Sequence, residues 1–153
     1  WTEPVVTRTG PVSCDVELTV TNTGDRAGSD VVQLYVSPPA SSFTRPAQQL
    51  AGVAKVHLEA GESQTVTIEL NPRSLALWDP ANQDHIEAHK RLAGSGAGVG
   101  LSGGSSHAVE AGWYVEAGDY TLNIAHSVGD VAFAETFTVS EPLGPLQNEA
   151  TLP

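Results

Sequence analysis

The chain has 153 residues, of which 40% are hydrophobic and 16% are charged, as is ordinary for a globular protein with one core. Its 7 basic and 18 acidic residues give a net charge of −11, which repels phosphate backbones and anionic membrane surfaces. Neither nucleic acid nor a membrane is therefore expected as a partner. The sequence also lacks an apolar run long enough to cross a bilayer, so a soluble protein is expected, with the choice between cytoplasmic and secreted left open.

A strand is predicted from Val12 to Val20, where apolar residues alternate with Ser, Asp, Glu and Thr. Cys14 takes an apolar position in this pattern and is expected in the core. As the single cysteine, it excludes an internal disulfide and a metal site built from several cysteines.

The chain begins at Trp1 without an initiator Met or a signal sequence, so we expect residues 1–11 to be a linker from a longer parent chain.

Turn-forming residues in the stretch TNTGDRAGSD come next, and they predict a hairpin between this strand and the following one. The run VVQLYV, residues 31–36, is apolar on both faces apart from Gln33, which is typical of a central strand covered on two sides. Pro38 and Pro39 end it. A weaker strand is predicted from Leu50 to Leu58, in which Gly52 indicates a bulge or a close backbone approach.

A hairpin turn at Gly61 and Glu62 is predicted to lead into the strand SQTVTIEL, whose apolar residues all face one way. The segment NPRSLALWD that follows predicts a single helical turn. Asn71 can cap this turn, and Pro72 is suited to the first helical position. Trp78 is then expected to anchor the edge of the core.

Residues 81–112 interrupt this rhythm and are interpreted as an inserted loop. The first part, ANQDHIEAHKRLA, is compatible with a helix. The second part, GSGAGVGLSGGSSHA, is a Gly and Ser tract that cannot bury enough apolar surface to offset its chain entropy. We expect the insertion to be mobile unless a partner holds it.

Two further strands are predicted after the turn EAGD. Tyr120 opens the first of them, and Val131, Phe133, Phe137 and Val139 mark the second. Short strands without a helix long enough for a crossover predict an all-β fold, an antiparallel sandwich of the immunoglobulin or fibronectin type III kind. Tyr120 fits the tyrosine corner of such sandwiches, in which the hydroxyl bonds to preceding backbone. Residues 141–153, rich in proline, are expected to be a C-terminal extension.

Motifs with catalytic or ligand-binding potential are weak. The glycines at 98, 100 and 103 satisfy G-x-G-x-x-G, and GLSGG loosely matches G-x-S-x-G, but both lie in the flexible tract without the strand that each motif requires. His85 and His89 could share a helix face and bind zinc, yet no third ligand is fixed, so solvated histidines are the favoured interpretation. None of the 18 acidic residues stands apart as a catalytic pair. We expect no catalytic residue, cofactor or metal on this chain.

Aromatic side chains offer one alternative, because sugar rings stack on them. Core roles are commoner, but Trp113 and Tyr114 adjoin the insertion and are the best candidates. Together with His85 and His89, they are the residues that we expect to contact a sugar or a neighbouring domain.

The order of motifs resembles a known family. The stretches VTNTGDRAGSDVVQLYVSPP, RPAQQLAGVAKVHLEAGESQTVTIEL, LALWD and WYVEAGDYTLNIAHS resemble the C-terminal fibronectin type III-like domain of glycoside hydrolase family 3, the β-glucosidase and β-xylosidase family. The resemblance covers about residues 12–140 apart from the insertion. It matches the following positions, which look structural rather than catalytic: Asn22, Gly24, Gly28, Gln33, Leu34, Tyr35, Arg45, Pro46, Leu50, Gly52, Lys55, Val56, Leu58, Gly61, Glu62, Trp78, Gly118 and Tyr120.

The resemblance implies a non-catalytic domain that packs on upstream catalytic domains of the same polypeptide, a barrel and an α/β sandwich, which hold the nucleophile and the acid/base of a retaining glycosidase. In the family the link between LWD and WYVEAGDY is usually short. We therefore hypothesise that the long insertion reaches toward those domains or a second protomer. Two other interpretations stay open: a carbohydrate-binding module that uses Trp113 and Tyr114, and an adhesive sandwich unrelated to a hydrolase.

Overall fold

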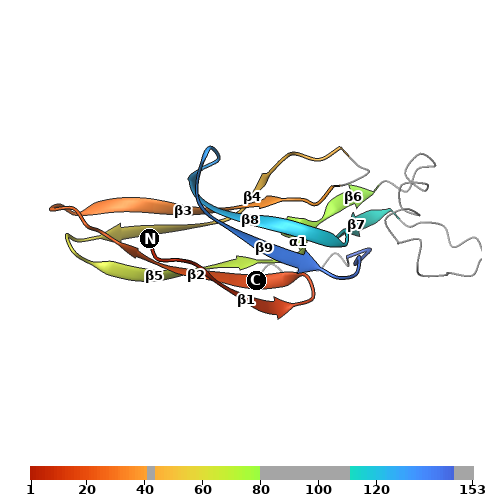
Figure 1. Cartoon of the computed structure of the whole chain (residues 1–153), viewed down its shortest axis with the longest axis horizontal. Coiled ribbons are helices and arrows are strands. Elements are labelled where there is room, and N and C mark those ends of the chain that lie inside the picture. The colour runs from red at the N-terminus through yellow and green to blue at the C-terminus, as the bar shows by residue number, and fades with distance from the viewer. Residues whose placement is uncertain (41–43, 80–110, 147–153) are drawn as a thin grey trace, which may run out of the picture.

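A computed structural model of the chain describes residues 1–40, 44–79 and 111–146, and its main body is a sandwich of two antiparallel sheets (Figure 1). One sheet has the strand order β1-β2-β5, the other β4-β3-β8-β9, and β6 and β7 form a short ribbon. This confirms the predicted fold class. The elements are β1 (Val5–Gly10), β2 (Ser13–Thr21), β3 (Gly28–Ser37), β4 (Gln49–Leu58), β5 (Ser63–Leu70), α1 (Pro72–Leu75), β6 (Leu77–Asp79), β7 (Gly112–Tyr114), β8 (Gly118–Ser127) and β9 (Asp130–Val139).

The core lies between the two sheets, and alternation in the strands supplies it. In β3, which the sequence predicts to be covered on both faces, only Val32, Leu34 and Val36 are buried, and the residues between them stay partly exposed. Along β2, β5 and most of β8, buried residues alternate with more exposed ones, as the sequence predicts for strands with one wet face. Cys14 is among these buried residues, as expected. The largest fully buried side chains are Tyr120, Leu34, Leu70, Leu75, Leu122 and Ile124.

The two predicted hairpins are wrong, because both turns carry the chain from one sheet to the other. β2 pairs with β1 and β5, whereas β3 pairs with β4 and β8. The turn at Gly61, which has a φ of 76°, likewise joins β4 to β5 in the opposite sheet. Turn residues show where a strand ends. Strands of both sheets bury one face, so their hydrophobic alternation is the same and does not show to which sheet the next strand belongs.

Asn22 fastens these two crossovers together at one end of the sandwich. Its side-chain amide donates to the carbonyls of Arg26 at 2.7 Å and Leu58 at 3.1 Å. Its backbone carbonyl also accepts from Gly61 N at 2.9 Å, and its backbone N–H donates to Glu62 O at 2.9 Å. The asparagine therefore satisfies backbone groups of both turns.

The structure differs from the expectation of a linker over residues 1–11, because Val5–Gly10 forms β1 and pairs antiparallel with β2. β1 is an edge strand with little buried surface, so it carries no clear alternation in sequence. Arg8 on this strand closes the side of the sandwich. Its guanidinium donates to Thr138 O and lies 4.1 Å from the centroid of the Phe137 ring.

Gly52 lies at a bulge and also at a close approach of two strands, the two features that the sequence indicates. The register of β3 and β4 shifts beside it, between Leu34 and Tyr35. A side chain at Gly52 would also collide with Ile68 in the opposite sheet, since an added Cβ would lie 2.5 Å from its Cγ2. The glycine thus permits a close approach of β4 to β5.

The short helix α1 confirms the predicted cap, but Trp78 differs from expectation. Asn71 Oδ1 accepts from Ser74 N at 3.1 Å, and Pro72 begins the helix. Trp78 is 48% exposed, while its neighbours Leu77 and Asp79 are buried. Because alternate residues of a strand face opposite ways, these neighbours take the inward positions and Trp78 faces out.

The last strand, β9, confirms the prediction in part. Phe137 and Val139 are buried, but Phe133 is only partly buried and Val131 is exposed. The register of β8 and β9 shifts next to Ile124 and Ala125, and such irregularities change the face that the following residues occupy.

Burial of Cys14 gives a prediction for alkaline stability. Burial raises the pKa of the Cys14 thiol to about 11, against a smaller lowering effect of the Arg8 charge. The unfolded chain ionises this thiol near its ordinary pKa of 9.0, so stability is retained below pH 9 and lost as the pH rises toward 11. The slope from this group is at most about 1.4 kcal/mol per pH unit. We expect Cys14→Val to show a shallower decline between pH 9 and 11 in urea titrations, and equal declines would contradict the assignment.

Candidate functional site

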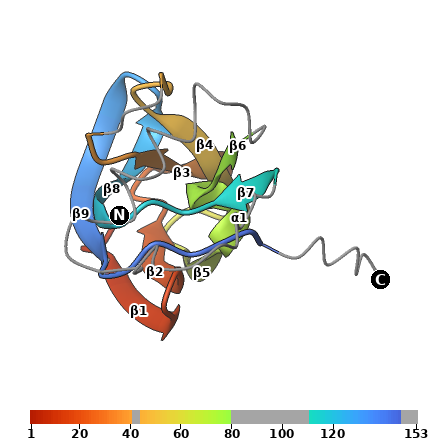
Figure 2. The same ribbon diagram turned by 90° about the vertical axis from the view of Figure 1, so that its right-hand side faces the viewer.

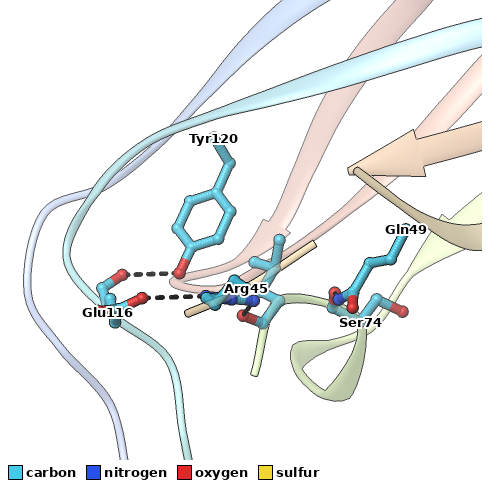
Figure 3. Close-up of polar contacts among 6 residues, drawn as sticks. Arg45, Gln49, Ser74, Glu116 and Tyr120 are labelled. Atoms are coloured by element: carbon cyan, nitrogen blue, oxygen red, sulfur yellow. Dashed lines mark hydrogen bonds and ion pairs between the residues drawn. The ribbon is translucent and has the colours of Figure 1, made fainter. Parts of the chain in front are cut away.

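The end of the sandwich next to α1 and β7 carries two groups of interacting side chains. The first is built around Arg45, which precedes β4, and Glu116, which lies between β7 and β8. Arg45 Nη1 lies 3.0 Å from Glu116 Oε2, and the two side chains are only 7% and 2% exposed. Arg45 Nη2 also donates to Leu75 O at 3.0 Å. One guanidinium therefore connects three separate segments of the chain (Figure 3).

Tyr120 completes this group from β8. Its hydroxyl donates to the backbone carbonyl of Glu116 at 3.1 Å (Figure 3), which is the geometry predicted for a tyrosine corner. Burial raises the pKa of Tyr120, and the Arg45 guanidinium opposes that rise. We call Arg45, Glu116 and Tyr120 the corner cluster.

A further hydrogen bond joins the start of β4 to α1, near the corner cluster. Gln49 Nε2 donates to Ser74 O at 2.9 Å, so the start of β4 is held to α1 as well. The carboxylate of Glu116 is enclosed by protein and paired with a cation. It cannot contact a sugar unless the cluster opens, so the arrangement is suited to holding segments in place and not to acid/base catalysis.

The second group, the aromatic arm, comprises Arg73, Trp78, Trp113 and Tyr114. Trp78 on β6 and Trp113 on β7 are register partners, and their ring centroids lie 5.5 Å apart at 59°. The Arg73 guanidinium carbon lies 3.3 Å from the centroid of the Trp113 ring. Both views place α1, β6 and β7 side by side at one end of the sandwich (Figures 1 and 2).

The segment after β9 packs along the aromatic arm. Leu146 N donates to Trp113 O at 2.8 Å, and Val115 and Leu143 exchange backbone hydrogen bonds of 2.8 and 2.9 Å. Gly144 has a φ of 149° and lies directly against the Tyr114 ring, where a side chain would collide. Trp113 and Tyr114 are therefore partly covered by Arg73 and by this segment, and Trp78 is the most exposed ring of the arm.

The structure thus brings together two of the four residues that the sequence nominated. Trp113 and Tyr114 lie next to each other on β7. His85 and His89 lie outside the described residues, as does most of the predicted insertion at 81–112. Sequence reasoning missed Arg73 and the contact between Trp78 and Trp113. The outward position of Trp78 could have been read from the alternation in LWD, whereas its partner 35 positions away could not.

Residues 1–40, 44–79 and 111–146 contain no group of three or more His, Cys, Asp or Glu side chains placed to hold a metal ion. In the same ranges, no helix is both long and apolar enough to span a membrane.

Comparisons with known proteins agree with this geometry. A fibronectin type III-like domain family matches residues 30–91. The chain is 34% identical over 135 residues to an exo-α-(1→6)-L-arabinopyranosidase of Bifidobacterium breve, covering 88% of this chain and 14% of that protein. It is 35% identical over 130 residues to a β-glucosidase of Kluyveromyces marxianus, covering 84% of this chain and 12% of that protein.

Solved structures of β-glucosidases also resemble this chain over a small part of their length. A GH3 β-glucosidase of Bifidobacterium adolescentis superposes with a TM-score of 0.69 at 29% identity, covering 98% of this chain and 18% of that one. The β-glucosidase of Kluyveromyces marxianus in complex with glucose gives a TM-score of 0.66 at 28% identity, over 92% of this chain and 14% of that one.

The sandwich with its tyrosine corner is a fibronectin type III-like domain. More specifically, the chain belongs to the fibronectin type III-like domains of glycoside hydrolase family 3, which confirms the resemblance seen in the sequence. It spans only 14% and 12% of the length of the two curated relatives above.

Proposed function

We propose that this chain is a non-catalytic accessory domain of a family 3 β-glycosidase. It packs on the catalytic domains of the same polypeptide and stabilises them. The parent enzyme hydrolyses terminal β-glycosides with retention of configuration, using carboxylates that lie on those other domains. In this proposal the described residues 1–40, 44–79 and 111–146 contribute a scaffold and no reacting group.

One observation carries this proposal. The chain aligns over 88% and 84% of its own length with two glycosidases, yet accounts for only 14% and 12% of theirs. A unit with its own core that recurs as a small part of larger enzymes is typical of an appended domain. The corner cluster supports the same conclusion, because its buried charges serve the fold and are closed to a substrate.

Activity measurements on three proteins test the proposal. We expect the full polypeptide to hydrolyse 4-nitrophenyl β-glycosides and to release the β-anomer first, as seen by NMR. The 153-residue chain alone should give no hydrolysis. A polypeptide that lacks residues 12–140 should lose activity faster on heating. Hydrolysis by the isolated chain, or an unchanged half-life without the domain, would overturn the proposal.

The aromatic arm favours a second candidate function, a carbohydrate-binding module. The half-exposed Trp78 beside Trp113 offers an aromatic surface on which a sugar could stack. Tryptophan fluorescence of the isolated chain, titrated with cello-oligosaccharides and soluble β-glucans, distinguishes the two candidates. A flat response is expected for the accessory domain. Saturable quenching that is lost in Trp78→Ala, Trp113→Ala or Tyr114→Ala would favour the binding module instead.

A further inference from the structure

The outer faces of the two main sheets differ in charge. On the three-stranded sheet, register places acidic residues in the middle of the exposed face. Two adjacent rows run across β1, β2 and β5 and contain three carboxylates: Val5–Glu17–Thr67 and Thr7–Asp15–Glu69. This face is typical of a surface that remains in water.

The four-stranded sheet presents an outer face whose middle carries no charge. Its outer residues alternate with buried ones such as Val32 and Leu34, so the register identifies them directly. Lys55 lies at one end of this face and Asp119 at the other. Between them, three rows across the sheet contain only uncharged residues: Val53–Gln33–Ala125–Val131, Leu50–Tyr35–Asn123–Ala134 and Ser37–Thr121–Thr136. We call these three rows the uncharged face.

The large apolar members of this face are accessible, whereas Ala125 in the first row is fully buried. Leu50, Val53 and Val131 are all among the exposed large hydrophobic side chains. They come from β4 and β9, the two edge strands of the sheet, and so flank the centre of the face on both sides. In a chain with a net charge of −11, an outer sheet face of this composition is an unusual surface to leave in water.

Four polar members of this face, Gln33, Tyr35, Ser37 and Asn123, already take part in hydrogen bonds within the chain. The Tyr35 hydroxyl donates to Gln33 Oε1 at 2.6 Å, and Gln33 Nε2 donates to His126 O at 2.7 Å. The Asn123 amide likewise donates to Ser37 Oγ at 3.0 Å and to Gln48 Oε1 at 3.2 Å. A partner could therefore cover these groups without leaving their donors unpaired, which keeps the desolvation cost low.

We propose that the uncharged face is the surface on which this domain docks against the glycosidase part of its own polypeptide, with the acidic face turned to solvent. This inference rests on the proposed function. In the relatives, the matching unit is covalently joined to a much longer chain, which gives that chain a high local concentration at the domain.

The charges of this chain favour docking through the uncharged face over docking through the acidic face. They also favour the parent polypeptide over a second copy of the chain as the partner. Docking through the three-stranded sheet would bury Asp15, Glu17 and Glu69, which is costly without matched cations. A second copy of the chain is disfavoured as the occupant, because association would bring together two domains that each carry −11.

Two exposed valines on edge strands provide a matched test. Val53 on the uncharged face is 58% exposed, and Val5 on the acidic face is 60% exposed. In the full polypeptide, Val53→Lys with Val131→Lys would bury two charges at the docked surface. We expect the half-life of glycosidase activity on heating to fall about tenfold. Val5→Lys should stay within about twofold of the unmodified enzyme.

Two further measurements make the outcome specific. In the isolated chain, the double variant and Val5→Lys should unfold at similar urea concentrations, which excludes a defect of the domain itself. Hydroxyl-radical labelling of Tyr35 should be strong in the isolated chain and weaker in the full polypeptide. Equal labelling of Tyr35, or equal half-lives for the double variant and Val5→Lys, would overturn the docking face. A polypeptide without glycosidase activity would instead refute the proposed function, and the labelling would still report on docking.

Discussion

Arg45→Ala is expected to lower the free energy of unfolding of the chain by about 3–5 kcal/mol, because it leaves a buried carboxylate without its cation. Glu116 is 2% exposed and lies 3.0 Å from the guanidinium. The same substitution removes the donor to Leu75 O, so a backbone carbonyl near α1 loses a partner too.

Urea unfolding followed by fluorescence measures this effect. Arg26→Ala is the matched control, because Arg26 is exposed, and it should change stability by less than about 0.5 kcal/mol. The double variant Arg45→Met with Glu116→Gln removes both charges. It should be less destabilised than the sum of its two single variants, since neither partner is then left as a buried charge. A response to Arg45→Ala no larger than that to Arg26→Ala would show that the ion pair contributes little.

Alternation made the strands of this fold predictable from sequence. In β2, β5 and β8 the side chains face two different environments, so the period of two is clear and the buried residues could be identified in advance. Features that depend on the type of a single residue were also predictable, such as the helix cap at Asn71 and the close approach of two strands at Gly52. Tyr120 was identified because a tyrosine that opens a late strand has a recurrent role in such sandwiches.

Long-range pairing accounts for what the sequence did not predict. β1 has almost no buried residues, so nothing in its composition separates it from a linker. The assignment of each strand to a sheet depends on contacts across the sandwich that no local pattern encodes. For the same reason Arg45 and Glu116 could not be paired in advance: they are 71 residues apart, and each taken alone is an ordinary charged residue.

Tyr120→Ala is expected to be similarly damaging, at about 3–5 kcal/mol, because it removes a fully buried ring from the core. Tyr120→Phe keeps the ring and removes only the hydroxyl, which leaves the Glu116 carbonyl without this donor. That loss should amount to about 1–2 kcal/mol. Comparing the two variants in urea therefore separates packing from the hydrogen bond of the corner.

Tyr35→Phe is the matched control for removing a hydroxyl, since Tyr35 donates to Gln33 on the outer face of the sheet, where water can replace the bond. It should change stability by less than about 0.5 kcal/mol. Alkaline pH gives an independent test. Because the pKa of Tyr120 is raised in the folded state, the stability that it contributes is present below the ordinary pKa of 10.0 and is lost as the pH rises above it. Tyr120→Phe should weaken this decline relative to the unmodified chain, and identical declines in these two proteins would mean that the corner hydroxyl is not held in its neutral form by the fold.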